Sequence, residues 1–180
     1  MLVNITFRHL ESTEALKLHA RDKVEHIQRY IDRPSEAHVV LHLENLVHHA
    51  DINLKAGPFL LRGRAKSGDM YASIDAAAEK IERQLKKHKE KLKNHKYVER
   101  PNGRAVEVKH EVFDVAKAPS DRVVKSSSFK AQAMSLDEAV LQLDLLDSQF
   151  FVFQNAKDHT INVLYRRDDG NLGLIEARAG

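Results

Sequence analysis

The amino-acid sequence predicts an α+β protein built from two domains. Three observations predict it. Apolar and polar residues alternate in Leu2–Arg8, as they do in a half-buried strand, two longer stretches carry apolar residues at helical spacing, and both patterns break down after residue 96. We therefore predict an N-terminal domain over residues 1–96, a flexible linker over 97–122 and a small C-terminal α/β domain over 123–180.

The N-terminal domain is predicted to have the order βαβββα. Ser12 or Thr13 is suited to cap the first helix, and Arg33-Pro34 ends it. The predicted elements are a strand over Leu2–Arg8, a helix to about Tyr30, strands over Glu36–Glu44, His49–Ala56 and Phe59–Lys66, and a helix from Met70 to about Lys93.

This order predicts a four-stranded sheet with both helices on one face. A helix between the first two strands implies a right-handed crossover, so those two strands should be parallel, and the later short links imply antiparallel neighbours. The helices must cover the apolar face. The opposite face is then polar and open, with Arg8, His38, His42, Asp51, Asn53, Lys55, Arg62 and Arg64.

The C-terminal domain is predicted from several short patterns. Ala105–Val115 alternates weakly and is interpreted as part of the linker, with at most a transient strand. Ser135 and Glu138 have capping-box spacing at the start of a helix that ends near Leu146. The predicted strands are Val123–Phe129, Gln149–Asn155, Thr160–Arg167 and Leu172–Ala177, with an Asp-Gly hairpin turn before the last.

Two of these C-terminal strands are apolar on both faces, and a sheet of this size with one helix covers only one face from within. A lone core below roughly 70–80 residues is also marginal. We therefore predict that this domain pairs with a second copy of itself. The alternative is that both faces pack internally or on the first domain.

Composition excludes several classes of function. The chain has no cysteine, which excludes disulfides, thiolate metal sites and a cysteine nucleophile. No apolar run approaches the ~20 residues of a membrane span, and the N-terminus does not resemble a signal peptide, so we expect a soluble, cytoplasmic protein. Nucleotide-binding and hydrolase motifs are absent. We expect no enzyme activity, no cofactor and no small-molecule substrate.

Eleven histidines raise the possibility of a metal site. His38 and His42 share a strand face but are about 13 Å apart. His48 and His49 are adjacent and should point to opposite faces, and His88 and His95 lie on a basic helix that would repel a cation. We therefore predict no metal site.

Positive charge is concentrated in residues 80–96, which carry eight Lys/Arg against two Glu, whereas the whole chain has a net charge of only +3. Four of these cations lie opposite the apolar stripe of the predicted helix: Lys80, Arg83, Lys87 and Lys91. The other four flank the stripe near its C-terminal end: Lys86, Lys89, Lys93 and Lys96. A solvated helix end explains two or three lysines. The remaining basic residues indicate that this helix binds the phosphate backbone of a nucleic acid. Aromatic residues that could stack on bases are scarce in this domain, so we expect the protein to recognise the phosphates and the shape of a folded RNA. The arrangement of helices on a sheet is similar to that of double-stranded RNA-binding domains.

Two segments resemble a known family. The first domain, through Gly68–Asp75 and Lys80–Lys89, resembles the ribosome hibernation promoting factors and their ribosome-associated inhibitor relatives. The second resembles the C-terminal domain of the long form of that family. The match runs through Glu138–Leu146, Phe150–Phe153, Asn155-Ala156, Ile161–Arg167 and Gly173–Glu176.

The resemblance implies a ribosomal function. Such factors bind the small ribosomal subunit and its 16S rRNA in the mRNA and tRNA channel, inhibit translation in stationary or starved cells, and dimerise ribosomes into inactive 100S particles through the C-terminal domain. It implies rRNA contacts on the second helix, on the first helix and on the sheet: Lys80, Arg83, Lys86, Lys87, Lys89, Lys91 and Lys93, then Lys17 and Arg21, then Arg62 and Arg64. It implies a homodimer interface at Phe151, Phe153, Ile161, Val163 and Tyr165.

The main alternative is a dimeric double-stranded RNA-binding regulator without a ribosomal site, because a long basic helix fits it almost as well. A more remote alternative is an RNA-processing enzyme with a dispersed carboxylate site.

Overall fold

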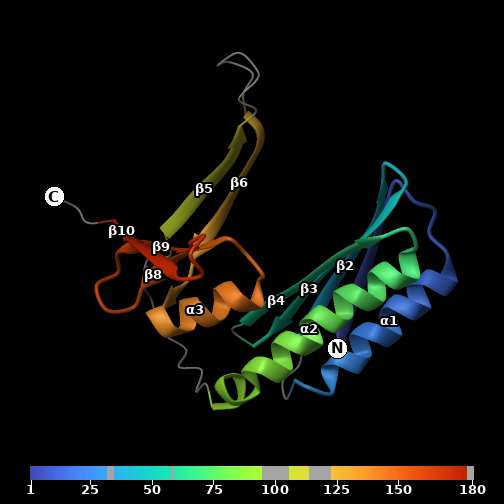
Figure 1. The fold of residues 1–180 in the computed structure, drawn as a ribbon, viewed down its shortest axis with the longest axis horizontal. Helices are drawn as coiled ribbons and strands as arrows, with labels where there is room; N and C mark the ends of the chain where they lie inside the picture. Colours follow the sequence, from blue (N-terminus) through green and yellow to red (C-terminus); the bar gives the residue numbers. More distant parts are fainter. Residues whose placement is uncertain (32–34, 58, 95–105, 114–122, 178–180) are drawn as a thin grey trace. The chain divides into compact units, whose positions relative to one another are not determined.

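The computed structural model describes residues 1–31, 35–57, 59–94, 106–113 and 123–177 (Figure 1). Contacts divide the chain into two compact units. The N-terminal unit comprises Met1–Val98, with which the short segment Leu141–Ser148 is grouped, and the C-terminal unit comprises Glu99–Val140 and Gln149–Gly180. None of the helices within the described ranges is long and apolar enough to cross a membrane.

The N-terminal unit has the predicted βαβββα order. Its elements are β1 (Leu2–Arg8), α1 (Glu14–Gln28), β2 (Ser35–Glu44), β3 (Val47–Ala56), β4 (Phe59–Ser67) and α2 (Met70–Asn94). Thr13 caps α1 as predicted, since its side chain accepts a hydrogen bond from the Leu16 amide at 3.3 Å. β3 begins two residues earlier than predicted, because a two-residue turn joins it directly to β2.

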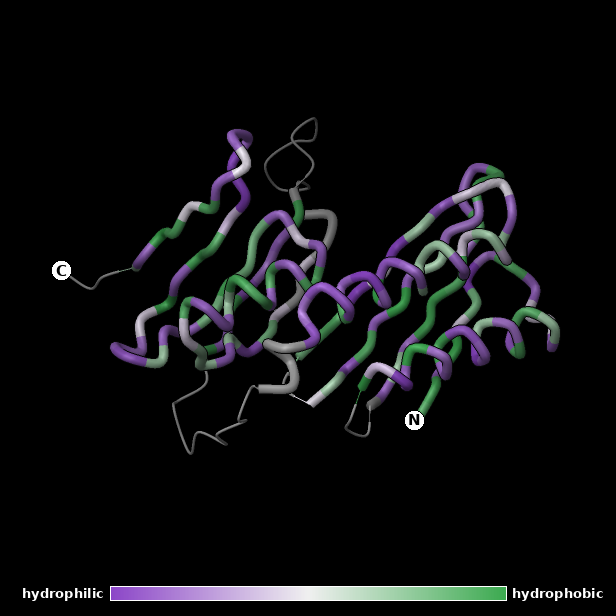
Figure 2. The backbone as a smooth tube through the Cα atoms, turned by 60° about the horizontal axis from the view of Figure 1, so that its bottom comes forward, coloured by the Kyte–Doolittle hydropathy of each residue, from purple (hydrophilic) through white to green (hydrophobic). Residues whose placement is uncertain are grey.

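The four strands form one sheet in the order β1-β2-β3-β4. β1 is parallel to β2, and β2–β3 and β3–β4 are antiparallel, which confirms the predicted crossover and hairpins. The alternation of hydrophilic and hydrophobic residues that sets this arrangement is visible along the tube in Figure 2.

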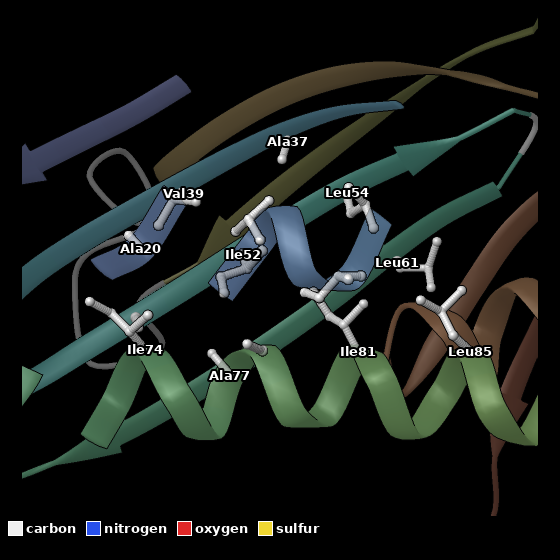
Figure 3. Close-up of a cluster of buried hydrophobic side chains, with 14 of the residues drawn as sticks. Ala20, Ala37, Val39, Ile52, Leu54, Leu61, Ile74, Ala77, Ile81 and Leu85 are labelled. Carbon is white, nitrogen blue, oxygen red and sulfur yellow. The ribbon is translucent and has the colours of Figure 1, made fainter. Parts of the chain in front are cut away.

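Both helices cover the same face of the sheet, α1 over β1 and β2, and α2 over β3 and β4 (Figure 1). Figure 3 shows the core between them. Side chains of α2 point toward the sheet, and Ile52, Leu54 and Leu61 meet them from the strands. Ile74, Ala77 and Ile81 of α2 are completely buried. The opposite sheet face is polar, as predicted, with His38, Lys55 and Arg64 exposed.

An ion-pair cluster joins the two helices. The Asp75 carboxylate on α2 lies 2.7 Å from His19 Nε2 and 3.1 Å from Lys23 Nζ, both on α1. Partial burial by itself would raise the pKa of Asp75, but hydrogen bonds from Lys23 and His19 outweigh it and hold the pKa below its usual value. The cluster therefore fixes the side of α2 that faces α1.

Asp75→Asn should destabilise the N-terminal unit by about 0.5–1 kcal/mol, because the pair is half exposed and solvent screens it. A carboxyl with a lowered folded-state pKa stabilises the fold above its unfolded pKa of about 3.9, and that stability is lost as the pH falls through the folded value. Urea unfolding should therefore show a difference between wild type and variant at pH 5 that shrinks below about pH 4. An undiminished difference at low pH would contradict this origin.

The described part of the C-terminal half of the chain contains two small sheets and one helix. One sheet has the order β10-β9-β8-β7, and the other is the pair β5-β6. Ser135 and Glu138 form the predicted capping box, with each side chain accepting from the other's amide. The elements are β5 (Val106–Phe113), β6 (Val123–Ala131), β7 (Ala133–Met134), α3 (Leu136–Leu145), β8 (Phe150–Asn155), β9 (Ile161–Arg166) and β10 (Leu172–Glu176).

The prediction of a flexible linker is wrong for part of its range. Residues 97–122 were expected to be a flexible connection, yet β5 lies inside that range and pairs antiparallel with β6 from Val106↔Ala131 onward. The alternation in this stretch was visible in the sequence, but a strand also needs a hydrogen-bonded partner. That partner is the strand at 123–131. Residues 97–105 and 114–122 lie outside the described residues.

Candidate nucleic-acid interface

The surface of α2 that faces away from the sheet is cationic. Lys80, Arg83, Lys86, Lys87 and Lys89 are all exposed, while Ile81 and Leu85 on the same turns are buried. The helical period of 3.6 residues separates the two sets, because residues three or four apart share a face. We call these five side chains the α2 basic face.

Two members of this face have acidic partners on the same helix. Arg83 Nη2 lies 3.5 Å from Glu79 Oε1, and Lys86 Nζ lies 3.7 Å from Glu82 Oε2. Lys86 Nζ also lies 5.3 Å from the centroid of the Tyr30 ring, in the turn that follows α1. Exposed pairs of this kind are weak, about 0.3–0.5 kcal/mol, so a phosphate can replace them.

Lys80 and Lys89 have no ion-pair or hydrogen-bond partner among the residues that the structure describes. Their charges are therefore the most available on the helix for a polyanion. Lys91 and Lys93 belong to α2 by their backbone, but their side chains lie outside the described part. The predicted roles of these two lysines remain predictions.

The candidates on α1 differ from one another. Arg21 is exposed, whereas Lys17 is half-buried and donates to Glu14 at 2.7 Å. The hydrogen bond from Lys17 holds the pKa of the Glu14 carboxyl below its usual value. Glu14 also lies in the first turn of α1, where the helix dipole favours a carboxylate. Of these two predicted contacts, only Arg21 is exposed, and the roles of both remain predictions.

Arg62 and Arg64 project from β4 on the open face of the sheet, opposite the helices. Arg62 donates to both carboxylate oxygens of Asp51 on the neighbouring strand, and Arg64 Nε lies 3.3 Å from Asp51 Oδ2. Asp51 offsets one of these two positive charges. Arg64 is exposed, and Arg62 is held in its bidentate pair.

The two groups of cations meet at the β4 edge. A surface hollow on the N-terminal unit is lined by Arg62, Arg64 and Lys66 of β4 and by Lys80 of α2. Lys66 was missing from the predicted contacts, although its spacing from Arg62 and Arg64 is the signal that places it on the same face. The basic surface therefore continues from the open sheet face around β4 onto α2.

The predicted dimer residues do not share a face of their sheet. Residues paired across two strands lie on the same face of a sheet. Val163 and Tyr165 of β9 therefore share a face with their partners Val152 and Phe150 of β8, and Ile161 lies on that face too, because it is two residues from Val163. Phe151 and Phe153 lie on the other face with Leu164. Phe153, which is predicted at the dimer interface, is fully buried within the single chain, with an exposure of 0%. Sequence reasoning missed this because both strands are apolar at nearly every position.

One face of this sheet remains apolar and open in the single chain. Phe150 is 50% exposed and Ile175 56%, and the residues between them are half-buried. We call this set the C-terminal apolar face: Phe150, Val152, Ile161, Val163, Tyr165 and Ile175. Gly173 leaves room for the Tyr165 ring there, since a Cβ at Gly173 would lie 2.3 Å from it.

Comparison with known proteins covers both parts of the chain. Residues 3–93 match the family model for sigma 54 modulation protein/S30EA ribosomal protein, and residues 118–174 match the model for the C terminus of that family. The chain belongs to the sigma 54 modulation protein/S30EA ribosomal protein family. Matches to both models confirm the resemblance to its long form.

Similar members of the S30EA family include two named ribosome hibernation promotion factor. The protein from Bacillus subtilis (strain 168) is 35% identical over 187 residues, 98% of this chain and 98% of that protein. The protein from Lactococcus lactis subsp. cremoris (strain MG1363) is 31% identical over 186 residues, 96% of this chain and 97% of that protein. The crystal structure of Thermus thermophilus Protein Y N-terminal domain is 32% identical, with a TM-score of 0.46, covering 48% of this chain and 98% of that one.

Proposed function

We propose that this chain is a ribosome hibernation factor that binds the small ribosomal subunit in the mRNA and tRNA channel, blocks translation and joins two ribosomes through its C-terminal unit. The names of its relatives support a role in hibernation. The observation that carries the proposal is the basic surface that wraps around the β4 edge from Arg64 and Lys66 to Lys80.

The distribution of charge favours an enclosed RNA site over a single duplex. A duplex bound on one side of the unit would use either the helix layer or the open sheet face. Here cations lie on both, with Arg83 on α2 and Arg64 on the sheet exposed. A channel with rRNA on several sides would engage both at once, through phosphate contacts that release counterions.

The C-terminal apolar face accounts for the pairing of two ribosomes. We propose that it pairs with the same face of a second copy, because a two-fold interface needs one self-complementary patch and this patch is apolar and continuous across β8, β9 and β10. Phe150, Val163 and Ile175 would be buried there. Each protomer then carries one ribosome-binding unit, so a dimer is able to join two ribosomes.

Sucrose-gradient sedimentation of purified ribosomes with the full chain tests the proposal. We expect the protein to co-sediment with the small subunit and to shift ribosomes to a heavier, paired species. Prior loading with mRNA and initiator tRNA should prevent binding if the channel is the site. Binding that persists unchanged on loaded ribosomes and equals binding to a generic RNA duplex would favour the double-stranded RNA regulator instead.

Val163→Glu should abolish pairing while leaving single-ribosome binding intact, because it places a charge at the centre of the C-terminal apolar face. Analytical ultracentrifugation should give a monomer, and the gradient should lose the paired species. Lys157→Glu, in the exposed loop after β8, is the charge-changing control and should still pair. Circular dichroism must show a folded variant. A folded Val163→Glu chain that still dimerises would refute this interface.

A further inference from the structure

The β2–β3 hairpin brings together the side chains of His42, Glu44 and His49, which come from two different strands. Asn45 and Leu46 form a two-residue turn in which both φ angles are positive, at 50° and 63°. Such a turn matches the twist of the strands and fixes their register. The register places His42 directly opposite His49.

The two imidazoles and one carboxylate converge on the open sheet face. The rings of His42 and His49 are stacked, with centroids 4.5 Å apart and planes inclined by 11°. Glu44 lies two residues beyond His42 on β2, so its side chain falls on the same face. One ligand atom from each of the three residues lies within 4.8 Å of the other two.

We propose that His42, Glu44 and His49 form a binding site for a divalent transition-metal cation, with Zn²⁺ as the best fit. Two imidazoles and one carboxylate are a ligand set that Zn²⁺ uses when it keeps a fourth position for water or an anion. Zn²⁺ binds nitrogen and oxygen ligands at about 2.0–2.2 Å. To bind one ion together, the three ligand atoms must move roughly 1 Å closer to one another than they are here. Glu44 is exposed and able to turn inward.

These three side chains are available as ligands. Within the described part of the chain, none of the three has a hydrogen-bond or ion-pair partner. His38, on the same face of β2, differs because its Nε2 lies 2.9 Å from Glu36 Oε1. Because the imidazole nitrogens of His42 and His49 are not engaged by another described side chain, they are suited to bind a metal that takes neutral nitrogen ligands.

Neighbouring charges limit which cation binds. Arg8 on β1 is the register partner of His42, and Lys66 on β4 is that of His49. Both are exposed, and both repel a cation. Asp51 is occupied by Arg62 and Arg64. Mg²⁺ and Ca²⁺ prefer a set of oxygen ligands, so they should not bind here, whereas imidazole nitrogens favour Zn²⁺.

Isothermal titration of the untagged full chain with Zn²⁺ tests the site. We expect one saturable site for Zn²⁺ and none for Mg²⁺. His49→Ala and His42→Ala should each weaken binding by more than about tenfold, because even second-shell partners contribute about 10–100-fold. Glu44→Gln should weaken it as well. His38→Ala is the matched control and should bind like wild type.

Thermal unfolding provides an independent readout. Zn²⁺ should raise the Tm of wild type and of His38→Ala, because a ligand that binds the native state stabilises it. It should raise the Tm of His49→Ala and His49→Gln by much less at the same Zn²⁺ concentration, and circular dichroism without metal shows whether these variants fold. The proposal is overturned if wild type shows no saturable binding. It is also overturned if His38→Ala loses as much affinity as His49→Ala, since other histidines would then hold the ion.

This inference does not depend on ribosome binding. The prediction from the sequence was that no metal site exists, and it rested on comparing histidines along one strand or helix. His42 and His49 are neighbours only across the hairpin.

Discussion

Gly63→Ala is expected to destabilise the N-terminal unit by about 3 kcal/mol, the upper end of the usual cost of overpacking. Gly63 is buried on β4 beneath α2. A Cβ there would lie 2.1 Å from the backbone carbonyl oxygen of Ala77 and 2.9 Å from Ile81 Cγ1. A backbone atom has no rotamer through which to move aside, so the whole helix must shift away from the sheet.

Urea unfolding followed by circular dichroism measures this loss of stability. Gly68→Ala is the control, because a Cβ at Gly68 meets nothing within 4 Å. We expect Gly68→Ala to change the free energy of unfolding by no more than about 0.5 kcal/mol. Equal stabilities for the two variants would contradict the close packing of α2 on β4. Because α2 carries the basic face, Gly63→Ala should also weaken RNA binding.

The double change Lys80→Glu and Lys89→Glu should weaken binding to the small subunit by about tenfold or more and flatten its salt dependence. Each neutralised phosphate contributes about 0.7–0.9 to the slope of log K against log salt. Losing two contacts should therefore lower the magnitude of that slope by about 1.4–1.8. Both lysines are exposed and lack partners within the described part, so the fold should be unaffected.

Affinities measured by filter binding from 50 to 300 mM salt give this slope. The control is Lys130→Glu with Lys157→Glu, which makes the same change in net charge at two exposed lysines of the C-terminal unit. We expect the control to keep the wild-type slope. If both double variants lose affinity equally, net charge drives binding and the α2 basic face has no special role.

Local signals in the sequence were sufficient for most of the N-terminal unit. Apolar spacing in β1 and α2 predicted both elements to within about a residue, since strand and helix periods are properties of consecutive residues. The capping side chains of Thr13 and Ser135 act over three residues, so they too were legible. The parallel pairing of β1 with β2 followed from the handedness of the crossover. The α2 basic face was also predicted, because the same helical period that places the apolar residues on one side of α2 places its cations on the other.

The failures have a different physical origin. β5 was assigned to a linker because a strand is stable only with a partner, and β6 begins ten residues after it ends. Phe153 was placed at an interface because β8 is apolar on both faces, and only the register with β9 distinguishes its buried side from the side of Val163. In each case the missing information was which strand pairs with which, and in what register.

The sequence by itself therefore determined the elements of the N-terminal unit, the order of its sheet, the cationic side of α2 and the family. Tertiary structure alone decided the continuity of charge from Lys80 to Arg64, the face on which Val163 lies and the meeting of His42 with His49. The reason is that helix and strand periods are set over a few neighbouring residues. The proximity of side chains from different strands is set by hydrogen-bond register, which no local period encodes.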